Sequence, residues 1–65
     1  MIKITNLNDY IVYFHKEDVY RFYESEYMTQ NFGTPKPCTD IMMKDNSIVS
    51  AKESIEEVYN KIEEN

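Results

Sequence analysis

Few side chains in this sequence are of types suited to catalysis. The 65 residues include one cysteine, Cys38, and one histidine, His15, the minimum set for a nucleophile and its base. Such a pair works only within hydrogen-bonding distance, with an orienting third group and an oxyanion hole. Any sequence with one residue of each type offers the same pair, so it carries little information. We expect Cys38 to be a small buried hydrophobic residue and His15 to be a surface residue at the end of a strand.

Neighbouring carboxylates that could act as a pair include Glu17–Asp18 and Glu56–Glu57. Paired carboxylates can perform acid–base catalysis, but neighbouring side chains on a strand or helix point in different directions. The sequence has no Asp-rich, Gly-containing calcium loop, no set of four Cys/His zinc ligands, and no glycine-rich phosphate loop, because Gly33 is the only glycine. We therefore expect solvated acidic faces and a protein that is not an enzyme and has no cofactor or metal.

The charge balance narrows the class of partner. Twelve acidic residues against seven basic ones give a net charge of −5, which disfavours direct binding to nucleic acid or to anionic membranes. The simplest role of this charge is solubility. The alternative is that acidic side chains bind a basic surface of a protein partner, including one that normally holds DNA or RNA. A lone thiol, no signal-peptide pattern at Met1–Thr5 and only short apolar runs predict a cytoplasmic protein.

Aromatic residues are the feature that stands out. Eight of the nine aromatic residues lie between Tyr10 and Phe32, more than a domain of this size can enclose. We expect about half of them in the core and the rest on the surface, where tyrosine favours interfaces. Within residues 20–27 aromatic and charged side chains alternate, with tyrosines as anchors and glutamates for basic groups of a partner. The predicted partner-binding residues are Tyr20, Arg21, Tyr23, Glu24, Glu26, Tyr27 and Phe32.

The elements that must position these side chains are mostly strands. Residues 2–5 alternate apolar and polar, residues 6–9 favour a turn, and residues 10–15 are aromatic and β-branched, so a β-hairpin is predicted over residues 2–15. Residues 19–27 fit both helical and strand spacing, and their composition favours a strand.

The second half of the chain begins with the predicted flexible loop 28–37, which holds the only glycine and both prolines. Residues 38–44 and 47–51 read as strands joined by a turn at Asp45–Asn46, which tolerates positive φ. The expected core residues outside the aromatic set are Ile4, Ile41, Ile48, Val58 and Ile62.

A C-terminal helix is predicted over residues 54–63. Ser54 and Glu57 form a capping box, in which each side chain bonds the other's backbone amide. The apolar stripe of this helix is Ile55, Val58, Tyr59 and Ile62. Together these elements predict a single α+β domain over residues 1–65, with a small antiparallel sheet of about four to five strands and one C-terminal helix.

Both ends of the chain resemble a known family. The residues concerned are Met1–Asn8 at the start and, later, Thr39, Ile41, Met43, Asp45–Asn46, Val49, Lys52–Val58 and Ile62. This pattern is similar to that of small FlbD/SwrD-type flagellar proteins, and the resemblance implies a mostly β protein with a C-terminal helix and a role in motility, with relatives in phage genomes. The chain departs from the family at Asp9 and Asn46, where glycines are expected in the two turns, and residues 28–37 look inserted.

These observations predict a small acidic binding protein, of the phage or mobile-element type, that inhibits or modulates a host protein (anti-defence) by protein–protein contact. One alternative is an FlbD/SwrD-like flagellar accessory protein. Another is an oligomeric sponge for a nucleotide-like small molecule, whose phosphate Arg21 or Lys36 would bind. In all three cases the small core and unpaired strand edges predict a homo-oligomer.

Overall fold

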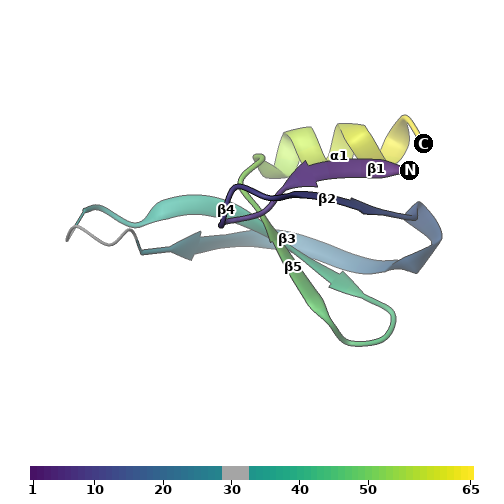
Figure 1. Cartoon of the computed structure of the whole chain (residues 1–65), viewed down its shortest axis with the longest axis horizontal. Coiled ribbons are helices and arrows are strands. Elements are labelled where there is room, and N and C mark those ends of the chain that lie inside the picture. The colour runs from purple at the N-terminus through teal and green to yellow at the C-terminus, as the bar shows by residue number, and fades with distance from the viewer. Residues whose placement is uncertain (29–32) are drawn as a thin grey trace.

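The computed structural model describes residues 1–28 and 33–65, and within them five strands precede one α-helix (Figure 1). A 3₁₀ turn, η1 (Lys16–Asp18), joins the second and third strands. The α+β class and the C-terminal helix predicted from the sequence are confirmed. The elements are β1 (Ile2–Thr5), β2 (Ile11–Phe14), β3 (Val19–Tyr27), β4 (Lys36–Met43), β5 (Ile48–Ala51) and α1 (Ile55–Glu63).

Strands β1 and β2 form the predicted N-terminal hairpin, antiparallel with Ile4 opposite Val12. Its turn is held by Asn6, whose side-chain oxygen accepts hydrogen bonds from the backbone amides of Asn8 and Tyr10, each at 2.9 Å. Asp9 completes the turn with a φ of 68°. A short polar side chain tolerates this left-handed conformation, so the turn closes without glycine.

The other three strands form an antiparallel sheet in the order β3-β4-β5. The ambiguous residues 19–27 are a strand, because their backbone pairs along β4 from Met43 to Lys36. The β4 strand starts at Lys36, so part of the predicted 28–37 loop is paired strand, and residues 29–32 of that loop lie outside the described residues. The turn between β4 and β5 lies at Asp45–Asn46 as predicted, with a φ of 74° at Asn46.

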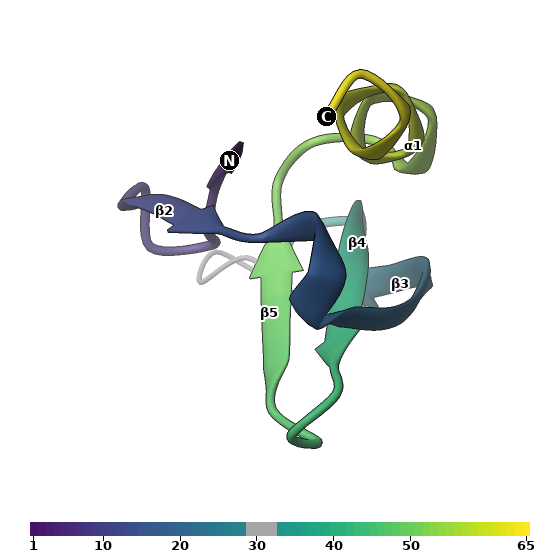
Figure 2. The ribbon, with the colours of Figure 1, turned by 90° about the vertical axis from the view of Figure 1, so that its right-hand side faces the viewer.

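The two sheets meet where β1 passes the end of β5. Asn6 forms a bridge with Ala51, and the Lys52 amide donates a 2.8 Å hydrogen bond to the Thr5 carbonyl. The Thr5 amide donates in turn to the carboxylate of Glu53. Figure 2 shows the β1–β2 hairpin on one side of β5 and the strands β4 and β3 on the other, with α1 above the sheet. Strands β2 and β3 are therefore the outer strands of the arrangement.

Helix α1 begins as predicted, with Ser54 as N-cap: its hydroxyl accepts a 3.2 Å hydrogen bond from the Glu57 amide. The reciprocal bond of the capping box is not among the hydrogen bonds of the described residues. Val58 is fully buried, and the helix packs against β1, β3 and β4. The nine residues of α1 are too few to cross a membrane, and the described part of the chain has no other helix that could do so.

The core is mostly aliphatic, with Phe14 in the buried cluster and Phe22 packed against it. Among the aromatic residues that the structure describes, Phe14 alone is buried, so the prediction that about half would be in the core was too high. The prediction was also wrong for Ile48, which is 51% exposed because its cross-strand partner Met42 faces away from the buried Ile41. The buried cluster comprises Ile2, Ile4, Phe14, Ile41, Ala51 and Val58.

Candidate functional site

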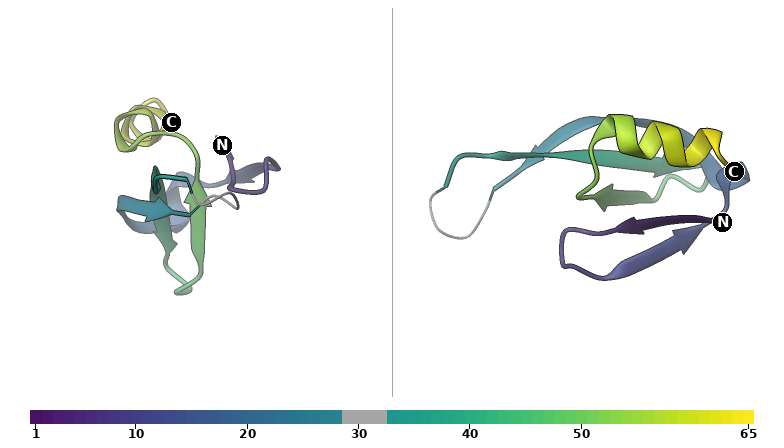
Figure 3. Two further views of the ribbon diagram at one scale, coloured as in Figure 1. Left: turned by 90° about the vertical axis from the view of Figure 1, so that its left-hand side faces the viewer. Right: turned by 90° about the horizontal axis from the view of Figure 1, so that it is seen from above.

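Strand β3 carries six of the seven predicted partner-binding residues, and none of its nine residues is buried. It is the first strand of the order β3-β4-β5, and within residues 1–28 and 33–65 no strand pairs with its other edge. The hairpin that it forms with β4 extends beyond the end of α1 (Figure 3). The strand therefore offers two faces and one backbone edge. The seventh predicted residue, Phe32, lies outside the described residues.

One face of β3 carries a cluster of two tyrosines around an arginine. The guanidinium carbon of Arg21 lies 5.8 Å from the ring centroid of Tyr20 and 5.9 Å from that of Tyr23. A β-bulge between Val19 and Arg21 inserts Tyr20 as an extra residue, which brings it beside Arg21. Exposed cation–π contacts of this kind contribute about 0.5–1 kcal/mol each. They hold the three side chains together on the surface, where Tyr20 is 66% and Tyr23 37% exposed.

This cluster continues onto the neighbouring strands. Arg21 pairs with Met42 on β4, and Met42 pairs with Ile48 on β5, so the three side chains form one row across the sheet. Strand alternation puts this row on the side away from Ile41 and the core. Ile48 is exposed and Met42 half-buried. We call this surface the aromatic face; its residues are Tyr20, Arg21, Tyr23, Met42 and Ile48.

The opposite face of β3 turns toward α1. Phe22, Glu24 and Glu26 lie on it, since Phe22 pairs with the buried Ile41 and Glu24 with the buried Thr39. The predicted binding residues are thus divided: the structure brings Tyr20, Arg21 and Tyr23 together and puts Glu24 and Glu26 on the other side of the sheet. Tyr27, half-buried, lies on the aromatic side at the far end of the strand.

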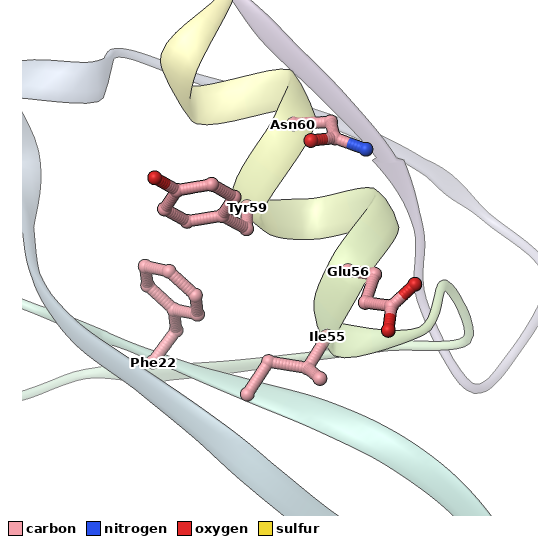
Figure 4. Close-up of a pocket in the computed structure, with 5 residues that line it drawn as sticks. All are labelled: Phe22, Ile55, Glu56, Tyr59 and Asn60. Atoms are coloured by element: carbon pink, nitrogen blue, oxygen red, sulfur yellow. The ribbon is translucent and has the colours of Figure 1, made fainter.

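A groove of about 440 Å³ lies between β3 and α1. Figure 4 shows the ring of Phe22 facing the ring of Tyr59, with Ile55 beside them. Glu56 and Asn60 add polar groups from the helix. We call this hollow the helix groove. A second hollow of about 350 Å³ lies further along the same strand, and its lining residues are Glu24, Ser25, Glu26 and Pro37.

The Cys38 thiol is buried, as expected, and its surroundings keep it protonated. Burial first, and then the negative charge of Asp40, raise the pKa of Cys38 above its ordinary value. Asp40 accepts a 2.7 Å hydrogen bond from the Ser50 hydroxyl, which fixes its carboxylate 3.9 Å from the sulfur. A thiol held neutral in this way is a poor nucleophile.

His15 does not join Cys38. It is exposed and precedes η1, whose last residue, Asp18, accepts a hydrogen bond from the Lys44 amide at one end of β4. Cys38 lies near the opposite end of that strand, six residues from Lys44, which corresponds to roughly 20 Å at the usual rise of about 3.3 Å per residue. The exposed carboxylate pairs of η1 and α1 gain no third ligand, because the part of the chain described by the structure holds no cluster of three or more potential metal ligands.

Several residues of the two surfaces were absent from the predicted site. Met42 was assigned to a strand without a role at the surface and Ile48 was predicted in the core, and the helix groove joins Phe22 and Tyr59 from elements far apart in the sequence. The one local signal was the position of Tyr59 at the margin of the apolar helix stripe. A scan against protein-family models finds no match for this chain, and searches of curated proteins and of solved structures find none either.

Proposed function

We propose that this protein acts without catalysis, by binding another protein through the aromatic face. The observation that carries the proposal is the exposed Tyr20–Arg21–Tyr23 cluster, prearranged by its own cation–π contacts. Tyrosine and arginine are the residue types that most often carry binding energy at interfaces. Arg21 and the two rings are already held together, so docking loses less side-chain entropy than ordering three separate side chains would.

The partner that fits best is a protein of basic surface charge in the host cytoplasm. The chain carries a net charge of −5, and long-range attraction between opposite charges accelerates encounter and selects the orientation of docking. A basic surface that normally holds DNA or RNA would satisfy this requirement. The biological role that we assign is therefore inhibition or modulation of a host protein by a phage or mobile-element product of the anti-defence type.

The test is capture of a partner from a lysate of the host cell, by the tagged protein and by two variants. The double variant Tyr20→Ala/Tyr23→Ala removes both rings of the cluster. The control Tyr10→Ala removes a ring of similar exposure, 69%, from the end of the β1–β2 turn. We expect the wild type and the control to retain a stoichiometric partner whose activity falls on binding, and the double variant to bind it at least about tenfold more weakly. Equal capture by all three proteins would contradict this role of the aromatic face.

The hollows of a single copy give no support to the small-molecule sponge, whose predicted pocket would lie between subunits. Arg21, one of the two residues suggested as phosphate ligands, lies on the aromatic face, away from the helix groove. The side chain with a charge among the groove's lining residues is Glu56, which repels phosphate. Lys36, the other suggested ligand, lies at the far end of the β3–β4 pairing.

A flagellar accessory role is the second candidate, supported by the backbone of the two turns. Asp9 and Asn46 stand where the FlbD/SwrD-type pattern has glycine, and both adopt the positive φ that glycine accommodates without strain. The departure from the family is thus compatible with the same turn geometry. Neighbouring genes that encode motility components would favour this candidate, and neighbouring phage functions would favour the first.

Self-association is part of the proposal for the first candidate as well. Ile11 and Tyr13 on the outer strand β2 are both exposed, which supports contact with a second copy. The mass in solution at micromolar concentration tests this point. A dimer or larger species is expected, and a monomer would remove self-association while leaving the aromatic face unaffected.

A further inference from the structure

We propose that the protein partner supplies an extended cationic segment, which pairs with the open edge of β3 and inserts an apolar side chain into the helix groove. This inference rests on the proposed function, because it specifies how the partner contacts the strand that carries the aromatic face. It also accounts for the division of the predicted binding residues: a strand added at an edge reaches both faces of its neighbour.

The first basis of the inference is the edge itself. Eight of the nine residues of β3 pair with β4 on one side, Tyr20 being the extra residue of the bulge, and no other described strand covers the second side. The unpaired N–H and C=O groups of such an edge are a ready template for another strand. The bulge that interrupts the pairing lies at the start of β3, between Val19 and Arg21, and the register is regular from Arg21 to Tyr27. A partner strand would therefore find a continuous ladder beside residues 21–27.

The second basis is the position of the helix groove. Phe22 contributes one wall from β3, and Tyr59 and Ile55 contribute the other from α1. A strand paired with β3 would direct every second side chain toward this side of the sheet. The apolar groove, about 440 Å³ in volume, has room for a large aliphatic or aromatic side chain at the level of Phe22.

The third basis is charge. Glu24 and Glu26 follow Phe22 on the same face of β3 and are both exposed. Glu56 lines the groove, and Glu63 lies one helical turn beyond Tyr59 on the same side of α1. Lysine or arginine side chains at alternate positions of an added strand would lie directly beside Glu24 and Glu26, where opposite charges stabilise cross-strand pairs.

The same charges disfavour a second copy of this chain at the edge. Two antiparallel β3 strands centred on Ser25 would set Glu24 of one strand opposite Glu26 of the other, and like charges across a strand pair are destabilising. This repulsion is local to β3, so it leaves the predicted contact between copies at the outer strand β2 unaffected. We therefore infer that the strand that pairs with this edge of β3 is a cationic segment of a different protein.

The test uses synthetic peptides and the full chain. The probe peptide has the order Thr-Lys-Thr-Lys-Thr-Leu-Thr, so that an antiparallel strand sets its lysines beside Glu26 and Glu24 and its leucine beside Phe22. A control peptide of the same composition, Lys-Lys-Thr-Leu-Thr-Thr-Thr, lacks the alternation. Two further peptides carry N-methyl groups on the odd or on the even amides, because only one of these sets can face β3 in a paired strand. Binding is followed at low salt by shifts of backbone amide resonances.

We expect the probe peptide to saturate at or below about 1 mM and to shift the amides of residues 21–27 and 55–60. One N-methylated peptide should retain this binding and the other should lose it at least about tenfold. Equal binding by the probe and the scrambled peptide, equal effects of the two N-methyl sets, or no binding at this concentration would each overturn the inference.

Matched charge reversals complete the test. The variant Glu24→Lys/Glu26→Lys should weaken binding of the probe at least about tenfold. The control Glu17→Lys/Asp18→Lys makes the same change in net charge on the exposed η1 turn and should weaken it far less. If the two variants lost the same affinity for the probe, overall charge alone would explain the loss, and the inference would be overturned. The capture experiment with Tyr20→Ala/Tyr23→Ala does not use these peptides. The peptides can therefore contradict strand pairing at β3 without contradicting the binding role proposed for the aromatic face.

Discussion

Strands β1 and β3 use their side chains in opposite ways. In β1 two of four residues, Ile2 and Ile4, are completely buried, whereas in β3 none of nine is buried although four of them are aromatic. The difference follows from how much of each strand is covered by neighbouring strands and by α1. Strand β1 lies between β2 and the end of β5 and contacts α1, while β3, within the described residues, pairs with a strand along one edge only and contacts α1 on one face only. Aromatic content alone does not decide which strand forms the core.

The comparison also separates folding from binding in this chain. A large apolar surface that the domain does not bury is typical of an interaction site. The two exposed surfaces of β3 differ in chemistry, aromatic on one side and acidic with an apolar groove on the other. Substitutions in β1 should therefore act on stability, and substitutions in β3 on recognition.

The largest expected effect is on the buried strand. Ile4→Ala removes most of a fully buried side chain, and we expect it to lower the free energy of unfolding by about 2–5 kcal/mol. Tyr20→Ala, on the exposed strand, should change it by no more than about 0.5 kcal/mol. Urea denaturation followed by circular dichroism measures both. If Tyr20→Ala destabilised the protein as strongly as Ile4→Ala, the division between the two strands would be wrong.

A smaller effect on stability is expected from substitutions at one cross-strand pair, in which Thr39 lies opposite Glu24. Thr39 is fully buried, and its hydroxyl donates a 2.9 Å hydrogen bond to the Glu53 carbonyl. Thr39→Val keeps the shape but leaves that carbonyl without this donor, so we expect a loss of about 1–3 kcal/mol in the free energy of unfolding. Glu24→Gln should leave it within about 0.5 kcal/mol of the wild type. Equal effects on the two sides of the pair would contradict the assigned burial.

The smallest expected effect concerns the ion pair that joins the β1–β2 turn to the end of β5. Lys52 donates to the Asp9 carboxylate, and this hydrogen bond, aided by the charge of Asp9, raises the pKa of Lys52 above its ordinary 10.5. A raised lysine pKa stabilises the folded state below the unfolded value, and the contribution is lost as pH rises through the folded value.

Thermal melting of wild type and Lys52→Gln measures this contribution. Because the pair is exposed, the difference in Tm should be small near neutral pH and should disappear once the pH exceeds the folded pKa of Lys52. Lys44→Gln, on the β4–β5 turn, serves as the control. A difference that grew with pH would have the wrong sign for the pair.

The sequence by itself determined the local conformations. Alternation in residues 2–5, turn residues at Asp45–Asn46 and a capping serine at Ser54 each act over a few neighbouring positions, and the structure has a strand, a turn and a helix N-cap there. The same local reading found the density of tyrosine and charge in residues 20–27. These features are predictable because they depend on φ preferences and hydrogen bonds within a few residues.

Only the tertiary structure decided which of those side chains are exposed to solvent and which contact each other. The pairing of residues 19–27 with β4 resolved their ambiguity between helix and strand. Packing of α1 on one face of the sheet left Ile48 exposed on the other, divided Tyr23 from Glu24, and brought Phe22 beside Tyr59. Such outcomes depend on contacts between distant segments, because an alternating strand presents two faces and its sequence does not state which one the rest of the chain will cover.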